Sequence, residues 1–390
     1  MMALSVMPGL LLVCAVFAGV MLALHLLTAL LAVPLRRRVA EGPLPPITLL
    51  RPVCGVDRFD AETLASSFVQ DHPDYRLIFC AARSDDPVVP LVRGLIAAHP
   101  QVQARLMIGE TRISGNPKLN NLCKGWAETE TPFVAMADSN LLLPPDYLRE
   151  LAGTWDPGCG LVTSPAVGIR PEGVWGAVEC AFLNTNQARL QLAADRLGFG
   201  FAQGKTLCWQ RDLLNGAGGL RRLGRDLAED VASTKVVRDE GRHVRLTAQP
   251  FAQPIGERSW AEMWGRQLRW SKLRRAGFPL VFLMEPLNGA LLPALAMAGV
   301  VLLGGAPASA LVAYLALWYG IEVVLARAHG WPMGLQDLGA MLLRDALIPV
   351  IWVATLLGRG AIVWRGNDVA AAPKLAPKLA ANLAPQPEQA

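Results

Sequence analysis

The two ends of this chain are apolar enough to cross a membrane, and this feature limits its possible folds more than any other. The first apolar block runs from Pro8 to Leu35, with His25 as its only ionisable residue. A helix of about 24 residues spans roughly 36 Å, which exceeds a hydrocarbon core of about 30 Å. No basic residue precedes the block, and the run is too long for the apolar segment of a cleavable signal peptide. The sequence therefore predicts an uncleaved transmembrane anchor over residues 1–36.

Further apolar stretches lie toward the other end of the chain. They cover residues 287–304, 308–326 and 338–364. Core helices of a soluble domain are the alternative, but such a succession with so few charges favours transmembrane segments within 279–366. Arg359 and Arg365 interrupt the last stretch and leave the number of passes open. The tail, residues 367–390, repeats an Ala-Pro-Lys-Leu unit and is predicted to be disordered.

The residues next to the first block indicate which side of the membrane the middle of the chain faces. Arg36, Arg37 and Arg38 follow it directly, and such basic residues stay on the cytosolic side. The seven cysteines are scattered and form no C-x-x-C pair, which fits a reducing compartment better than a disulfide framework. We therefore expect a cytosolic domain over residues 37–278 of a multi-pass membrane protein. The richness in Ala, Leu and Arg favours a bacterial inner membrane.

The net charge of +5 does not indicate a nucleic-acid partner. No basic run with interleaved aromatic residues follows Arg38, and Arg274 and Arg275 lie just before an apolar stretch. Attraction to the surface of the lipid bilayer explains these charges better.

In the middle of the chain, short β-rich runs alternate with helical patterns. Strands are expected at 47–53, 76–82, 104–108 and 133–137, and helices at 60–69, 86–99 and 116–128. This alternation predicts right-handed crossovers and a mostly parallel sheet, hence an α/β fold. Ligands of such sheets bind beyond the carboxyl ends of the strands. The acids that follow a strand are Asp85, Asp86 and Asp138.

Several common nucleotide and hydrolase motifs are missing from the sequence. No G-x-G-x-x-G follows the first expected strand, and there is no G-x-x-x-x-G-K-[ST]. Both the dehydrogenase type of dinucleotide site and the P-loop are therefore disfavoured. There is also no G-x-S-x-G and no H-E-x-x-H, so the chemistry must come from separated acids and a basic, aromatic helix.

Asp138 is a candidate ligand for a divalent cation. A nucleoside diphosphate leaving group needs Mg²⁺ or Mn²⁺, and such hard cations bind one or two carboxylates together with water and phosphate oxygens. Asp138 follows an apolar strand and could supply that carboxylate, although an acid here could equally cap the next turn. Asn140 stands where the second acid of a D-x-D pair would be.

Two adjacent acids open the helix expected at 231–240. For Glu229 the favoured interpretation is a favourable charge at the helix N-terminus. Asp230 is the candidate base, because an inverting group transfer needs one carboxylate to take the proton of the attacking hydroxyl.

The stretch 259–273 is expected to form an amphipathic helix. Arg266 and Arg269 are three residues apart and therefore share one side of it, where two guanidinium groups suit a diphosphate. Trp270 follows, and Trp260 and Trp264 precede. A helix that merely lies at the bilayer interface remains an equally good interpretation of this segment alone.

These pieces together resemble the ceramide glucosyltransferases, which carry a D, D, D, (Q/R)xxRW signature. The resemblance covers residues 45–290. The matching signature residues are Asp86, Asp138, Asp230 and Arg266-x-x-Arg269-Trp270. Connecting segments are similar too, at Arg51-Pro52-x-x-Gly55-Val56-Asp57, Ala104-Arg105-Leu106-x-Ile108-Gly109 and Asn116-Pro117-Lys118-x-Asn120-Asn121-Leu122.

The resemblance implies a GT-A fold, a UDP-sugar donor such as UDP-glucose, and a ceramide-like lipid acceptor. It also implies a role for each signature residue. Donor-binding residues would be Asp86, Asp138 with its divalent cation, Lys118, Arg266, Arg269 and Trp270, and the base would be Asp230. The chain departs from animal members at Gln187-Ala188-Arg189, where they carry His-Pro-Arg, in a stretch expected to border the acceptor.

Other functions stay open from the sequence. Diacylglycerol or a hopanoid could replace ceramide as the acceptor. A processive polysaccharide synthase shares the basic, aromatic motif, but such synthases usually need more membrane helices than are expected here. A non-catalytic membrane scaffold would not need Asp86, Asp138 and Asp230 together with Arg269.

Overall fold

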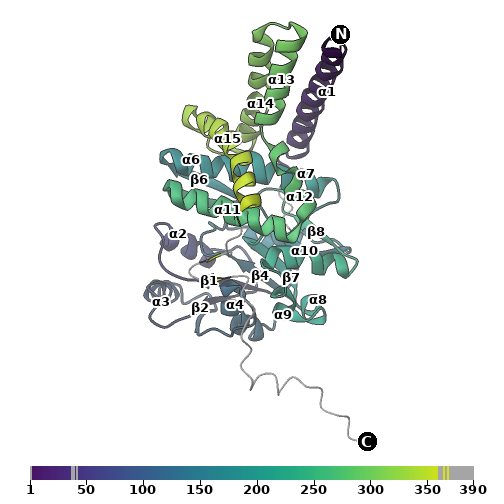
Figure 1. Ribbon diagram of the computed structural model, residues 1–390. Helices are drawn as coiled ribbons and strands as arrows, with labels where there is room; N and C mark the ends of the chain where they lie inside the picture. The colour runs from purple at the N-terminus through teal and green to yellow at the C-terminus, as the bar shows by residue number, and fades with distance from the viewer. Residues whose placement is uncertain (1, 37–39, 41–42, 359–362, 365–366, 369–390) are drawn as a thin grey trace, which may run out of the picture.

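A computed structural model shows a sheet-containing domain at one end and a group of projecting helices at the other (Figure 1). The structure describes residues 2–36, 40, 43–358, 363–364 and 367–368. From residue 369 on, the tail that was predicted to be disordered lies outside the described residues.

The central sheet has seven strands in the order β3-β2-β1-β4-β7-β5-β8. They are β1 (Ile47–Val53), β2 (Tyr75–Ala81), β3 (Ala104–Ile108), β4 (Phe133–Ala137), β5 (Cys159–Thr163), β7 (Thr206–Gln210) and β8 (His243–Leu246). β7 runs antiparallel to β4 and β5, whereas the other pairings are parallel, which confirms the predicted mostly parallel sheet. A separate parallel pair is formed by β6 (Ala166–Glu172) and β9 (Phe251–Glu257).

Both faces of the sheet are buried, which explains why its strands are apolar almost throughout. Neighbouring residues of a strand point to opposite faces, and Leu49 and Leu50 of β1 belong to different core clusters, both fully buried. The covering helices are α2 (Asp60–Ala65), α3 (Val88–Ala98), α4 (Pro117–Ala127), α5 (Tyr147–Thr154), α8 (Arg211–Gly216), α9 (Gly219–Leu223) and α10 (Glu229–Asp239). A 3-10 turn, Ser66–Phe68, extends α2.

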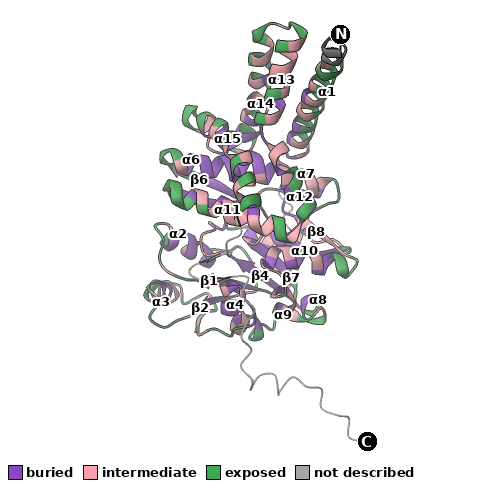
Figure 2. Ribbon diagram, in the orientation of Figure 1, coloured by how far each residue is buried: buried purple, intermediate pink, exposed green. Residues whose placement is uncertain are grey.

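The predicted membrane segments form long apolar helices. They are α1 (Met2–Leu31), α13 (Leu291–Gly304), α14 (Ala308–His329) and α15 (Leu335–Leu357). Within the described residues, three helices are long and apolar enough to cross a membrane, and a fourth span exists if the bent pair Pro279–Asn288 and Leu291–Gly304 is counted. Exposed residues run along α1 and α13 (Figure 2), and Leu12 and Leu302 are 64% and 83% exposed. Apolar side chains exposed in such rows indicate contact with lipid.

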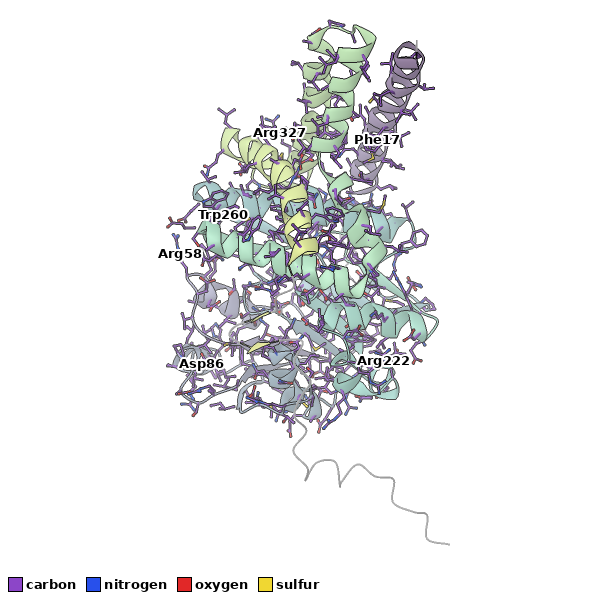
Figure 3. All side chains as sticks on the ribbon, viewed as in Figure 1. Phe17, Arg58, Asp86, Arg222, Trp260 and Arg327 are labelled. Atoms are coloured by element: carbon purple, nitrogen blue, oxygen red, sulfur yellow. The ribbon has the colours of Figure 1, made fainter. Side chains whose placement is uncertain are left out.

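A layer of helices separates the sheet from the projecting helices (Figure 1). It contains α6 (Gly173–Ala181), the π-helix Phe182–Ala188, α7 (Arg189–Arg196), α11 (Trp260–Gly277) and α12 (Pro279–Met284). α11 begins with a capping box between Ser259 and Glu262, as a stable helix start requires. Trp260 stacks on Trp264 and contacts Trp175 at a tilt, with ring centroids 5.1 and 4.8 Å away, and it lies at the outer edge of this layer (Figure 3). A helix over 259–273 is thus confirmed, but apolar and polar residues are little separated along it, and its place at the bilayer interface stays a prediction.

A buried polar cluster joins the membrane helices to this layer. Arg344 lies 2.9 Å from Glu322 and 2.7 Å from Asp345, so it links α14 and α15. Its guanidinium also donates to the hydroxyl of Thr185 in the π-helix at 2.7 Å. Because the charges are paired and hydrogen-bonded, the cluster fixes the membrane helices relative to the layer above the sheet.

Candidate active site

The site forms where β4 ends and β7 begins. In the antiparallel pairing Ala137 lies opposite Thr206, so the next residue outward on β4, Asp138, meets the residue that precedes β7, Lys205. The backbone N–H of Asp138 donates to the carbonyl of Lys205 at 3.0 Å. The carboxylate of Asp138 therefore lies at the carboxyl end of a central strand, as the sequence predicted.

Lys118 connects two of the acids. Asn116 caps α4 by accepting hydrogen bonds from the backbone N–H groups of Lys118 and Leu119, which places Lys118 in the first turn. Its ammonium lies 2.7 Å from the carboxylate of Asp138 and 2.8 Å from that of Glu229. Burial disfavours the charge on Lys118, but the two carboxylates outweigh burial and raise its pKa.

Lys205 is a second ammonium at Asp138, and the sequence analysis did not find it. Its Nζ lies 3.1 Å from Asp138 Oδ2 and donates to Asn140 Oδ1 at 3.0 Å. Burial lowers the pKa of Lys205, and the positive charge of Arg266 acts in the same direction. Burial alone would raise the pKa of Asp138, but Lys118 and Lys205 together lower it to about 2.

Glu229 and Asp230 enter the site from the N-terminus of α10. The amide nitrogen of Asn116 donates to Glu229 at 2.6 Å, and Lys118 approaches the other carboxylate oxygen. Glu229 is thus a partner within the site, in addition to the helix-terminal charge that was predicted. Asp230 accepts a hydrogen bond at 3.3 Å from the backbone N–H of Gly204, the residue directly before Lys205. A Cβ on Gly204 would lie 2.9 Å from a carboxylate oxygen of Glu229, so a larger residue there would displace the Glu229 side chain.

The carboxyl group of Asp230 is a better base than an ordinary aspartate. Burial raises its pKa, and the nearby charge of Glu229 raises it further, to about 6. A base with this pKa is largely deprotonated at neutral pH and yet accepts a proton more readily than a carboxylate of ordinary pKa. Asp230 therefore has the electrostatic setting that its predicted role requires.

Asp86 lies at the same edge of the sheet, after β2. Its carboxylate accepts hydrogen bonds from the backbone N–H of Gly55 at 2.9 Å and of Val88 at 3.0 Å. These bonds fasten the loop after β1 to the start of α3, and Gly55 adopts a positive φ of 68° that favours glycine. The hydrogen bonds of Asp86 thus shape the loop after β1 and do not connect Asp86 to the cluster around Asp138. Figure 3 shows Asp86 on the sheet domain.

The arginines of α11 lie in the layer above the sheet, and the charge of Arg266 reaches the site, where it acts to lower the pKa of Lys205. Arg266 forms an ion pair with Glu179, a fully buried carboxylate of α6 that also lies 3.8 Å from Arg258. Arg269 is half-buried one turn further along the helix. Trp270 packs against the buried cluster that contains Leu183 and Ile255. Glu179 was missed by the sequence analysis, although a lone acid in an apolar helix is a signal for a buried ion pair.

The oxygen ligands present fit a divalent cation that binds together with a diphosphate. Within the described residues no group of three or more His, Cys, Asp or Glu side chains could hold a metal by itself. A carboxylate oxygen of Asp138 and the amide oxygen of Asn140 lie close together, since both contact the ammonium of Lys205. Oxygen is the ligand atom that Mg²⁺ and Mn²⁺ prefer. One such carboxylate plus phosphate oxygens and water is a usual shell for Mg²⁺.

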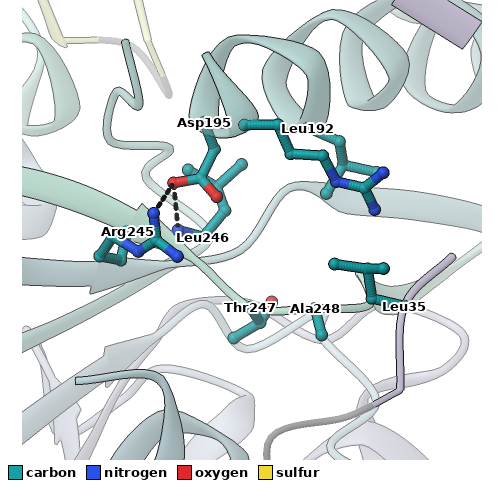
Figure 4. Close-up of a pocket in the computed structure, with 8 residues that line it drawn as sticks. Leu35, Leu192, Asp195, Arg245, Leu246, Thr247 and Ala248 are labelled. Atoms are coloured by element: carbon teal, nitrogen blue, oxygen red, sulfur yellow. Dashed lines mark hydrogen bonds and ion pairs between the residues drawn. The ribbon is translucent and has the colours of Figure 1, made fainter. Parts of the chain in front are cut away.

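Of two cavities in the described part of the chain, the smaller one adjoins elements of the site. One, of about 210 Å³, lies where the chain leaves α1 and is lined by Leu35, Leu192 and the ion pair of Asp195 with Arg245 (Figure 4). The other, of about 170 Å³, is lined by Val231 of α10 and by Gly277 near the end of α11. The second cavity adjoins the residue after Asp230 and is therefore the closer of the two to the proposed base.

The stretch that departs from the animal pattern contacts both α11 and α1. Gln187 donates to Gln267 of α11 at 3.4 Å, and Arg189 donates to the hydroxyl of Thr28 in α1. Residues 187–189 therefore bridge the helix that carries Arg266 and the first membrane helix.

Comparison with known proteins agrees with this geometry. The family model of glycosyl transferase family 21 matches residues 10–375, which is nearly the whole chain. The chain belongs to glycosyl transferase family 21. This confirms the resemblance that the D, D, D, (Q/R)xxRW residues indicated.

Curated proteins to which this chain is similar include two from Caenorhabditis elegans. Ceramide glucosyltransferase 1 is 28% identical over 296 residues, which cover 74% of this chain and 63% of that protein. Ceramide glucosyltransferase 3 is 27% identical over 335 residues, 84% of this chain and 73% of that protein. The match to the first relative thus spans less than two thirds of its length.

Among solved structures, a mannosyltransferase from Pyrobaculum calidifontis, solved with GDP-Man and Mn²⁺, superposes with a TM-score of 0.56. The two share 16% identity, and the superposition covers 91% of this chain and all of the other. This likeness confirms the predicted fold: a GT-A domain with a mostly parallel sheet, flanked by apolar helices.

Proposed function

We propose that this family 21 protein transfers a hexose from a UDP-sugar to the primary hydroxyl of a membrane lipid, with inversion at the anomeric carbon. UDP-glucose and ceramide are the proposed donor and acceptor, and the products are a β-glycolipid and UDP. The names of the relatives support this choice of substrates. The observation that carries the reaction type is the carboxylate of Asp230, whose pKa is raised and whose neighbour Glu229 pairs with the ammonium of Lys118.

In the proposed reaction, Asp230 accepts the proton of the lipid hydroxyl as its oxygen attacks the anomeric carbon. The bond from that carbon to the diphosphate breaks on the opposite face, so the configuration inverts and UDP leaves. Negative charge grows on the diphosphate, and Lys118, Lys205 and the α11 arginines would stabilise it. A bound divalent cation, held by Asp138, would supply further positive charge at this point. Asp86 would hold the nucleotide through the loop that it shapes.

The proposed arrangement relative to the bilayer has four parts. Residues 1–36 would anchor the chain, 37–278 would form the cytosolic catalytic domain, 279–366 would return to the membrane, and 367–390 would be a tail. The tryptophan edge of α11 would then lie at the lipid surface. The bridge formed by residues 187–189 between α1 and α11 supports the proposal that the lipid acceptor enters beside this stretch. The membrane would be the inner membrane of a bacterium.

A direct test combines the purified protein with a panel of UDP-sugars and lipid acceptors and reads the products by mass spectrometry. We expect glucosylceramide as the main product. Transfer to diacylglycerol or a hopanoid, but not to ceramide, would keep the chemistry and change the acceptor. Long sugar polymers would instead indicate a polysaccharide synthase, and no transfer at all would contradict the proposal.

The rate of transfer should fall in acid. A base works only when deprotonated, and the pKa of Asp230 is raised to about 6, so kcat/KM should be nearly constant above pH 7 and fall about tenfold per unit below about pH 6. The measurement is a pH profile with UDP binding followed over the same range as a control. A rate that stays constant down to pH 4.5 would exclude Asp230 as the base.

Removal of divalent cations should stop turnover. Excess EDTA is expected to lower the rate by about a hundredfold or more, because the cation stabilises the leaving group by several kcal/mol. Added Mg²⁺ or Mn²⁺ should restore it. An unchanged rate in excess EDTA would remove Asp138 from the role of metal ligand.

A further inference from the structure

The ammonium of Lys205 lies between two oxygen atoms that a cation would bind. Its Nζ is 3.1 Å from Asp138 Oδ2 and 3.0 Å from Asn140 Oδ1. These oxygens belong to the first and third positions of the segment Asp138-Ser139-Asn140, where a D-x-D pair would supply its two carboxylates. With Asn140 in the third position, the segment has one negative charge instead of two, and the ammonium of Lys205 balances it.

The backbone holds Lys205 in this place before any ligand binds. Its carbonyl accepts from the N–H of Asp138, and its own N–H donates to the side chain of Gln203 at 3.0 Å. The side chain is 12% exposed and that of Asp138 is 23% exposed, so both can be reached by a ligand. The position is a consequence of the antiparallel pairing of β7 with β4.

The two lysines of the site differ in how many of their N–H groups are in use. Each ammonium has three N–H donors. Lys118 uses all of them, on Asp138, Glu229 and the carbonyl of Gly204. Lys205 uses two within the part of the chain that the structure describes, on Asp138 and Asn140. One N–H of Lys205 is therefore left without a protein partner among the described residues, and it could bind an anion.

We propose that the ammonium of Lys205 binds the diphosphate of the nucleotide. The protein would therefore keep part of its affinity for the nucleotide when no divalent metal is bound. The proposal rests on the proposed function, since it takes a nucleoside diphosphate as the ligand. The ammonium would donate its third N–H to a phosphate oxygen and would neutralise charge there. Chemistry would still need the divalent cation, whereas binding of UDP would not depend on it entirely.

The test is UDP binding by titration calorimetry to the full-length protein in detergent, with excess EDTA and with Mg²⁺. Wild-type protein should bind UDP under both conditions. Lys205→Met should bind UDP nearly normally in Mg²⁺ but lose about tenfold to a hundredfold in affinity in EDTA, because a charge-assisted hydrogen bond is lost. Binding in Mg²⁺ also shows that the variant is folded. Lys205→Arg keeps the charge and should retain binding in EDTA.

Lys235→Met is the matched control, because that lysine lies on α10, pairs with Asp226 before the helix and makes no contact with Asp138 or Asn140. It should bind UDP as wild type does under both conditions. The proposal is overturned if Lys205→Met binds UDP in EDTA as well as wild type, if it fails to bind in Mg²⁺, or if Lys205→Arg loses binding in EDTA. It is also overturned if wild type binds UDP only with Mg²⁺. Absence of UDP binding by wild type under every condition would instead contradict the proposed function.

Discussion

Replacing Asp230 by Asn is expected to lower the rate of sugar transfer by about 10²- to 10⁴-fold, the usual contribution of a positioned general base. The amide is close in size to the carboxylate and can still accept the hydrogen bond from Gly204. It cannot take up the proton of the lipid hydroxyl. UDP affinity should therefore change little, because the lysines that would meet the diphosphate keep their places.

Asp226→Asn is the matched control for this prediction. Asp226 precedes the same helix and pairs with Lys235, so the substitution removes a similar charge outside the cluster. Its transfer rate should stay within about threefold of wild type, as expected for loss of a partly exposed ion pair that does not contact the cluster. Transfer by Asp230→Asn at a rate near that of wild type would show that the base is another residue.

Replacing Lys118 by Met is expected to have the largest effect on stability. The lysine side chain is 5% exposed and lies between Asp138 and Glu229, so its loss leaves two largely buried carboxylates without their main counter-charge. Removing one partner of a buried ion pair typically costs about 3–5 kcal/mol of folding free energy. The variant should unfold at a clearly lower temperature and should bind UDP weakly, because unbalanced carboxylates repel a diphosphate.

Lys124→Met is the matched control, because it removes another lysine of α4 that does not contact the two carboxylates. Lys124 lies on the same helix, but its ammonium contacts only oxygens of Asn121 among the bonds that the structure describes. The control should unfold within a few degrees of wild type and should bind UDP normally. Equal unfolding temperatures for wild type and Lys118→Met would contradict the ion-pair network as described.

Much of the fold could be predicted because it depends on local pattern. The four parallel strands begin or end within one residue of the predicted positions, since apolar runs between helical patterns define them well. Asp138 could be predicted as a site residue for the same reason, because strand ends of a parallel sheet meet at one edge. The membrane helices are evident from length and hydropathy alone.

The rest of the site depends on pairings between distant segments, which local pattern does not report. Lys205 reaches Asp138 only because β7 pairs antiparallel with β4. An alternation of strands and helices along the sequence predicts parallel strands, so it does not reveal an antiparallel one. Glu229 pairs with Lys118, which lies 111 positions earlier in the sequence. The sequence alone therefore could not distinguish its role in the ion-pair network from that of a favourable charge at a helix N-terminus. Glu179 meets Arg266 for a similar reason: α6 and α11 pack together in the layer above the sheet.

The central claim is that these residues form one site that transfers a sugar to a lipid hydroxyl with inversion. The most direct measurement is the anomeric configuration of the product, determined by NMR after incubation of the purified protein with UDP-glucose, ceramide and Mg²⁺. The α-linked donor should give a β-linked glucosylceramide, with one UDP released for each sugar transferred. An α-linked glycolipid, or release of UDP without any sugar on the lipid, would contradict a single displacement assisted by Asp230.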